Sequence, residues 1–222
     1  TLHKTLTNLH QEPGAHLAVV FGPRQVGKTA AIRAWARQPA LVTQESQKPG
    51  DNRLFFWTAP HTSAPNQLRS LAQAWFAFLQ PAARVDPSLS YGSWARFWDE
   101  VAQASLGARL TLVLDDFFHV LAADPTAGPA LRNAWDYRFR PSASTGRSQA
   151  CVVLAGTPQG PAQWAALGEP DPLFRRATLI PVSPLPFQAL ATWLPDASNE
   201  ERLAAFALTG GRPGLLAYWR SG

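Results

Sequence analysis

The chain has 222 residues, of which 46% are hydrophobic and 16% are charged. This composition predicts one packed domain with a small appendage and excludes a disordered chain. The formal net charge of +5 permits contact with nucleic acid. The arginines are scattered from Arg24 to Arg220, however, which favours an ordinary solvated surface over a nucleic-acid patch.

The single cysteine and the short apolar runs argue against a disulfide-linked protein and against a membrane-spanning one. Cys151 has no partner for a disulfide, and its apolar neighbours predict a buried, unreactive thiol in a reducing, cytoplasmic setting. No apolar run reaches the length of a membrane span, so no membrane partner is expected. The chain contains no Met, which indicates that its native N-terminus lies upstream of Thr1.

Short apolar runs alternate with longer helical patterns along most of the chain, which is typical of βαβ units around a parallel sheet. Five strands are predicted, at His16 to Phe21, Leu54 to Thr58, Leu110 to Leu114, Ala150 to Ala155 and Thr178 to Val182. Helices are predicted between them, at Lys28 to Gln38, Asn66 to Leu79, Tyr91 to Leu106 and Pro129 to Tyr137. The helical tryptophans Trp35, Trp75, Trp94 and Trp98 are expected to pack in the core, and Pro141 to Ser148 is expected to be a mobile loop.

The alternation ends at two closely spaced prolines, Pro184 and Pro186, which cannot continue a strand or a helix interior. A short helical segment is predicted from Phe187 onward. A second helix, Arg202 to Leu208, follows cap-type residues and ends at glycine. We therefore expect a core at residues 1–182 and a helical lid, or the start of a C-terminal domain, at residues 183–222.

A phosphate-binding loop is predicted directly after the first strand. Residues 22–29 fit the pattern GxxxxGK[ST] and lie between an apolar strand and a helix, which is the context that the motif requires. Lys28 is expected to be exposed and to neutralise phosphate, and the Thr29 hydroxyl to bind Mg²⁺. The residues expected to contact the nucleotide are Gly22, Pro23, Arg24, Gln25, Val26, Gly27, Lys28, Thr29 and Ala30. The alternative is an ordinary glycine turn with a surface lysine.

The third predicted strand ends in two carboxylates, as a Walker B element does. Asp115 is expected to help hold Mg²⁺, and Asp116 to orient or deprotonate the attacking water. An acid that merely caps the following loop is the alternative for each. Thr157, after the fourth strand, is placed to sense phosphate, although a Gly-Thr pair is commonplace. Arg175 and Arg176 precede the last strand, where one could act as an arginine finger or both could form a solvated turn.

Taken together, these elements resemble the archaeal-type ATPase family, a branch of the STAND NTPases within the wider AAA+ group. The matching stretches are GPRQVGKT, LTLVLDDF, VVLAGT, PLFRRATLIPVSPL and TGGRPGLL, in the family's order. The resemblance implies an α/β three-layer P-loop fold with a parallel sheet of order 5-1-4-3-2 and a helical lid. It also implies a C-terminal winged-helix or effector domain that these residues do not include.

Two positions depart from the family pattern. The opening adenine-side element is not recognisable in residues 1–14, and Asp116 stands where Glu is common. Because Asp is one methylene shorter than Glu, slow hydrolysis is expected, with a gain on Asp116→Glu. The sequence thus predicts a weak ATPase that binds ATP and Mg²⁺ and acts as a nucleotide-driven switch, and it is compatible with a homo-oligomer. The alternatives are a non-hydrolysing nucleotide-binding scaffold and a DNA-loading ATPase of the replication-initiator type.

Overall fold

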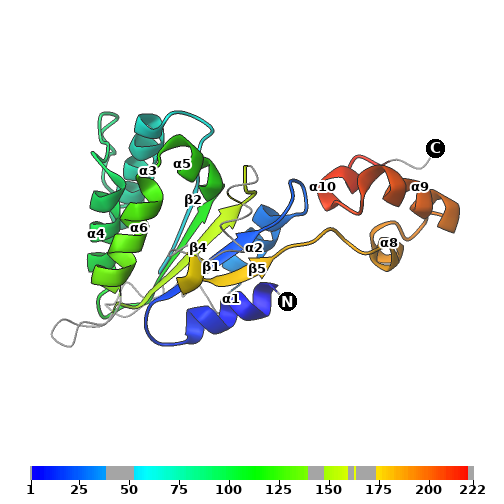
Figure 1. Cartoon of the computed structure of the whole chain (residues 1–222), viewed down its shortest axis with the longest axis horizontal. Helices are drawn as coiled ribbons and strands as arrows, with labels where there is room; N and C mark the ends of the chain where they lie inside the picture. The colour runs from blue at the N-terminus through cyan, green and yellow to red at the C-terminus, as the bar shows by residue number, and fades with distance from the viewer. Residues whose placement is uncertain (1, 39–52, 140–147, 160–162, 164–173, 220–222) are drawn as a thin grey trace.

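A five-stranded parallel sheet forms the centre of the molecule (Figure 1), in a computed structural model that describes residues 2–38, 53–139, 148–159, 163 and 174–219. The strand order is β2-β3-β4-β1-β5. The strands are β1 (His16–Phe21), β2 (Arg53–Thr58), β3 (Leu110–Asp115), β4 (Ala150–Gly156) and β5 (Thr178–Pro181). Read from the other edge this is the order 5-1-4-3-2, so the predicted α/β fold is confirmed.

Helices cover both faces of this sheet and make a three-layer sandwich (Figure 1). One face carries α1 (Leu2–Gln11) and α2 (Lys28–Ala36). The other carries α3 (Ala64–Leu79), α4 (Trp94–Ala104), α5 (Phe117–Ala123) and α6 (Ala127–Ala134), which a short π-helix (Trp135–Phe139) extends. Because successive side chains of a strand point to opposite faces, each central strand contributes to two cores. Leu17 and Val19 belong to one core, and Ala18 and Val20 belong to the other.

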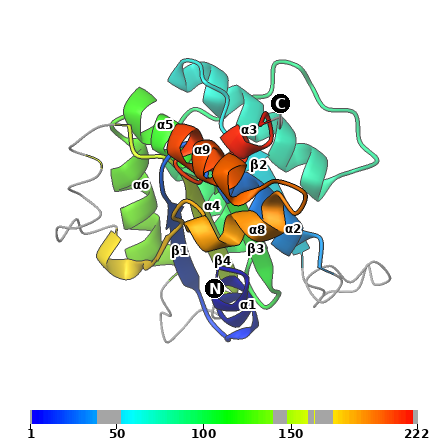
Figure 2. The ribbon, with the colours of Figure 1, turned by 90° about the vertical axis from the view of Figure 1, so that its right-hand side faces the viewer.

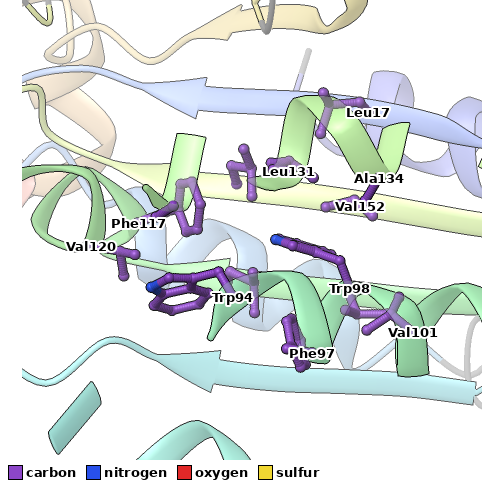
Figure 3. Close-up of a cluster of buried hydrophobic side chains, with 14 of the residues drawn as sticks. Leu17, Trp94, Phe97, Trp98, Val101, Phe117, Val120, Leu131, Ala134 and Val152 are labelled. Carbon is purple, nitrogen blue, oxygen red and sulfur yellow. The ribbon is translucent and has the colours of Figure 1, made fainter. Parts of the chain in front are cut away.

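Aromatic side chains fill much of the larger core (Figure 3). Trp94 and Trp98 of α4 are fully buried beside Phe117, and Trp75 of α3 is 1% exposed. Trp35 is buried in the opposite core, where its indole N–H donates to the Thr7 hydroxyl. The prediction that these tryptophans serve packing is therefore confirmed.

Cys151 is also buried, as its apolar neighbours predict. It lies on β4 between β1 and β3, and burial raises the pKa of its thiol to about 11. A thiol with this pKa is almost entirely protonated at neutral pH and is therefore a poor nucleophile.

Three described helices were missed by the sequence pattern: α1, α5 and the short α10 (Pro213–Leu216). Helix α1 packs Leu6 and Leu9 against the sheet, and a spacing of three to four apolar residues in Leu2, Leu6 and Leu9 is the signal for it. Helix α5 begins immediately after Asp116, in a stretch for which no element was predicted. The predicted mobile loop lies mostly outside the described residues. Its last residue, Ser148, is buried and contacts the Ser105 hydroxyl at 2.8 Å.

The residues after β5 form a separate group of short helices beyond the end of the sheet (Figures 1 and 2). They are a 3-10 turn η4 (Phe187–Ala189), α8 (Leu190–Trp193), α9 (Asn199–Thr209) and α10 (Pro213–Leu216). Leu190, Ala205 and Leu216 form a small core of their own. A capping box between Ser198 and Glu201 opens α9, as the cap-type residues predict. Within the described ranges, no helix is long and apolar enough to cross a membrane.

Candidate nucleotide-binding site

A cavity of about 520 Å³ lies where the carboxyl ends of the parallel strands meet. This is the edge of an open α/β sheet at which ligands commonly bind, and the volume suits a small molecule. The cavity is lined by the loop after β1, including Lys28 and Thr29, by Asp116 after β3 and by Thr157 after β4. Trp193 and Pro213 from the C-terminal helices close its far side. His61 from the loop after β2 also lines the cavity, so the site is assembled from the ends of four strands and from the C-terminal helices.

The loop after β1 presents the start of α2 to this cavity. Gly27 is the N-cap of α2 and has a φ of 88°, a left-handed conformation that favours glycine. No side chain caps the helix, so the N–H groups of its first turn are open to a ligand. Such N–H groups, together with the helix dipole, favour a bound anion such as phosphate.

Lys28 is buried, so the expectation that it is exposed is wrong. Only 7% of its surface is accessible, because the ammonium turns back into the loop. Lys28 Nζ donates hydrogen bonds to the carbonyls of Gly22 at 3.0 Å and Pro23 at 2.7 Å, and to Thr157 Oγ1 at 2.8 Å. Burial lowers the pKa of Lys28, while the nearby carboxylates of Asp116 and Asp115 oppose that shift. Lys28 thereby connects the ends of β1 and β4 at the edge of the cavity.

Asp115 and Thr29 form a small oxygen-rich group next to Lys28. The Thr29 hydroxyl donates to Asp115 Oδ2 at 2.8 Å. Asp115 is 1% exposed, and its Oδ1 has no hydrogen-bond partner among the described residues. Burial raises the pKa of this carboxyl, and the hydrogen bond from Thr29 partly offsets the effect. A buried, unpaired carboxylate oxygen beside a hydroxyl fits a hard divalent cation such as Mg²⁺, which prefers oxygen ligands.

Asp116 adopts an uncommon backbone conformation. Its φ is 56° and its ψ is 30°, and it serves as the N-cap of α5. Asp is several-fold enriched among residues in this left-handed region, because its short side chain can hydrogen-bond locally. The backbone therefore supplies a reason for Asp rather than Glu at this position. Its carboxylate faces the cavity, and Oδ2 lies 3.3 Å from His61 Nε2.

The two predicted finger arginines do not line the cavity. Arg176 makes a bidentate ion pair with Asp136, through Nε at 2.7 Å and a terminal nitrogen at 2.9 Å. Arg175 is exposed on the same 3-10 turn, η3 (Phe174–Arg176). The structure therefore does not bring either residue to Lys28 and Asp116 within this chain. A role of Arg175 across a subunit boundary stays a prediction.

The C-terminal helices contact the phosphate-binding loop directly. Gly214 N donates to Gln25 O at 2.9 Å, at the start of α10. A Cβ at position 214 would lie 2.8 Å from Gln25 Cβ and 3.1 Å from Gln25 O, closer than such atoms normally approach. Glycine at position 214 thus allows α10 to rest on the loop.

We predict that Gly214→Val weakens nucleotide binding by about tenfold, because the added side chain separates α10 from the loop and removes one cavity wall. Titration of a fluorescent ATP analogue measures the effect. Gly92→Val is the matched control, since a Cβ at Gly92 meets nothing within 4 Å. Equal affinities of the two variants would show that the contact does not matter for binding.

Several cavity residues were missed at the level of sequence. His61, His119, Trp193 and Pro213 all line the cavity, although none belongs to a phosphate-binding motif. His61 follows β2 by three residues, and the convergence of strand ends in a parallel sheet was a signal that could have found it. No comparable signal was available for Trp193 and Pro213, because their positions depend on how the C-terminal helices pack.

Solved structures with the same fold exist, although no protein-family model and no curated protein sequence matches the chain. The Walker-type ATPase PABY2304 of Pyrococcus abyssi aligns with a TM-score of 0.57 at 15% identity, over 96% of this chain and 64% of that one. The ORC2 protein of Aeropyrum pernix, in ADPNP and ADP complexes, aligns with a TM-score of 0.61 at 13% identity, over 97% and 59%. The ORC1 protein of Aeropyrum pernix, in complex with DNA, aligns with a TM-score of 0.59 at 14% identity, over 96% of this chain and 55% of that one.

These similarities place the chain in one structural class. It has the α/β fold of the Walker-type ATPase and of the two ORC proteins, and the loop after β1 lies at the same edge of the sheet as Asp116 after β3. The chain spans less than two thirds of the length of each of these three solved chains.

Proposed function

We propose that the chain is a Mg-ATP-binding ATPase domain that hydrolyses ATP slowly, of the archaeal-type branch of the STAND NTPases. The observation that carries the proposal is the group formed by Lys28, Thr29 and Asp115 in one cavity at the carboxyl edge of the sheet. A buried ammonium, an open helix N-terminus and a carboxylate with an unpaired oxygen together match the charges of a nucleotide phosphate and its cation.

Each residue has a distinct task in this proposal. Lys28 exchanges its contact with Thr157 for the terminal phosphates, and the first turn of α2 binds them through its N–H groups. Thr29 and Asp115 hold Mg²⁺, which would neutralise charge that develops on the phosphates. Asp116 orients the attacking water, and Thr157 senses the terminal phosphate from the end of β4. ATP and Mg²⁺ are therefore the proposed cofactors.

The decisive experiment is a single-turnover ATPase assay on the parent chain and on Asp116→Asn. Asn tolerates the left-handed backbone and has the size of Asp, so the change removes only the charge. We expect slow turnover in the parent and about a tenfold further loss in the variant, with nucleotide affinity little changed. A parent that binds ATP without releasing phosphate would instead identify a non-hydrolysing scaffold.

We predict a separate role for Arg175 in turnover. An exposed guanidinium can reach the phosphates of a neighbouring subunit, where it stabilises charge that appears late in the reaction. Arg175→Ala should therefore lower the turnover number about tenfold at high protein concentration, while the affinity for ATP is unchanged. Arg84→Ala, which removes another exposed arginine, is the control. Parent-like turnover in Arg175→Ala would identify Arg175 as a surface residue.

The C-terminal helices are proposed to be a lid, at residues 183–222, on a core at residues 1–182. They have their own small core, and they reach the cavity through Trp193, Pro213 and Gly214. Nucleotide binding could then reposition them and transmit a signal to a C-terminal effector or winged-helix domain. Small-angle scattering with and without Mg-ATP would detect such a movement.

A DNA-loading ATPase of the replication-initiator type is the second candidate function. Two observations favour it: the similarity to the ORC1 protein that was solved with DNA, and the net charge of +5. An electrostatic DNA contact weakens steeply as the salt concentration rises. Fluorescence anisotropy of labelled duplex DNA with the parent chain, at several salt concentrations and with and without ATP, tests this function. ATP-dependent, salt-sensitive binding would support it.

A further inference from the structure

Two histidines and one carboxylate meet at the edge of the cavity. His61 comes from the loop after β2, Asp116 from the end of β3, and His119 from the first turn of α5. One ligand atom from each residue lies within 4.8 Å of the other two. The two imidazole rings are in contact, with centroids 3.6 Å apart and planes inclined by 33°. Two of the five histidines of the chain therefore share one small space with a carboxylate.

The backbone holds these three residues in place. His119 N donates to Asp116 O at 2.9 Å, so both side chains belong to one tight turn. The loop that carries His61 is attached to the same strand end, because Ala59 N donates to Asp115 O at 2.9 Å. The side-chain amide of Gln67, which is 1% exposed, donates to Pro60 O at 3.0 Å. His61 is exposed and Asp116 and His119 are half-buried, and rotation of these side chains on a fixed backbone is the movement that would bring the three ligand atoms onto one ion.

We propose that His61, Asp116 and His119 bind one divalent transition-metal ion of the Co²⁺ to Zn²⁺ series. Imidazole nitrogens suit these ions, whereas Mg²⁺ prefers oxygen ligands and an octahedral shell. A zinc ion bound by imidazole nitrogen and carboxylate oxygen lies about 2.0–2.2 Å from each ligand atom, so the three ligand atoms have to move closer together to share one ion. Three protein ligands leave a fourth position open to water or to a ligand in the cavity.

This metal site is separate from the proposed Mg²⁺ site, although the two adjoin. Asp115 faces the Thr29 hydroxyl in a buried, oxygen-only group, while Asp116 faces two imidazoles at the exposed edge. Neighbouring carboxylates on one strand end thus serve ions of different chemistry. Binding of the transition metal engages Asp116, the residue proposed to orient water, and therefore competes with hydrolysis.

The test uses the full chain without nucleotide and Co²⁺ as the probe, so that its result does not depend on ATP binding. Calorimetry measures the affinity, and visible absorption reports coordination by imidazole. We expect one Co²⁺ per chain, displaced by Zn²⁺ but not by a large excess of Mg²⁺. His61→Ala and His119→Ala should each weaken binding at least tenfold, since even changes to residues behind the ligands cost that much.

Two control variants make the outcome decisive. His16→Ala removes a histidine whose side-chain contacts are with Glu12 and Pro13 and should bind Co²⁺ like the parent. Lys28→Ala should also keep the Co²⁺ site, even where it has lost ATP, which separates this proposal from the proposed function. Circular dichroism confirms that each variant is folded. Parent-like Co²⁺ binding in folded His119→Ala, or equal losses in His16→Ala and His119→Ala, would overturn the proposal.

Discussion

Lys28→Ala is expected to lose Mg-ATP binding at micromolar nucleotide concentrations. The change removes the only ammonium that the described structure places against the phosphate-binding loop, where it contacts Gly22, Pro23 and Thr157. An affinity loss of at least a hundredfold, or about 2.8 kcal/mol, is the expected size. Isothermal titration calorimetry measures it directly.

The burial of Lys28 adds a second expectation for the same variant. Its loss leaves two loop carbonyls without their charged donor, which should lower the free energy of unfolding by about 1–3 kcal/mol. Thermal unfolding of the nucleotide-free chain checks this, and Lys28→Met keeps the aliphatic stem for comparison. Lys4→Ala, which removes an exposed lysine of α1, is the matched control for both measurements. Unchanged ATP affinity in folded Lys28→Ala would contradict the assignment of the loop.

Asp115→Asn is expected to have opposite effects on activity and on the stability of the nucleotide-free chain. Asn keeps the size of Asp and can still accept the hydrogen bond from Thr29, but it has no charge for a cation. Turnover should therefore fall about a hundredfold, a loss in the range of a missing catalytic group. Because the variant also removes a carboxylate that is 1% exposed, it should unfold at a higher temperature than the parent.

The pH dependence of stability provides a further measurement on Asp115→Asn. Burial raises the pKa of Asp115 in the folded chain above its usual value, so the folded state binds more protons than the unfolded state between the two values. The free energy of unfolding of the parent should therefore fall as the pH rises through that window. In Asp115→Asn, the free energy of unfolding should lack this decrease with rising pH. Identical pH profiles in urea titrations would show that the Asp115 carboxylate is not strained by burial.

The sequence predicted the parallel sheet because its strands are apolar on both faces, whereas the strand order was expected from the family resemblance alone. Leu17 and Ala18 point to opposite cores, and a strand that lies between two helical layers has to be apolar on both of its faces. The loop between β1 and α2 was equally visible, since Gly27 and Lys28 belong to a motif that combines local residues with a strand and a helix, and its binding of phosphate stays a prediction. These features depend on residues that are close in sequence.

The features that the sequence did not show depend on distant contacts or on backbone conformation. The expected gain on Asp116→Glu rests on side-chain length and stays a prediction, and the left-handed backbone at Asp116 is a separate feature that disfavours Glu. The ion pair of Arg176 joins residues forty positions apart, through Asp136. The burial of Lys28 depends on Thr157, which follows β4, and no local pattern around Lys28 could report that contact.

The hydrogen bond between Gly214 and Gln25 has a consequence for the energetics of the whole chain. It joins the C-terminal helices to the loop that is proposed to bind the nucleotide, so the position of the helices and the binding of the nucleotide would be thermodynamically coupled. Such linkage is reciprocal: a nucleotide that favours docked helices must itself bind more tightly whenever another molecule holds those helices in place. A protein that pulls α10 away would promote nucleotide release by the same factor. The affinity for ATP would then depend on the position of α10.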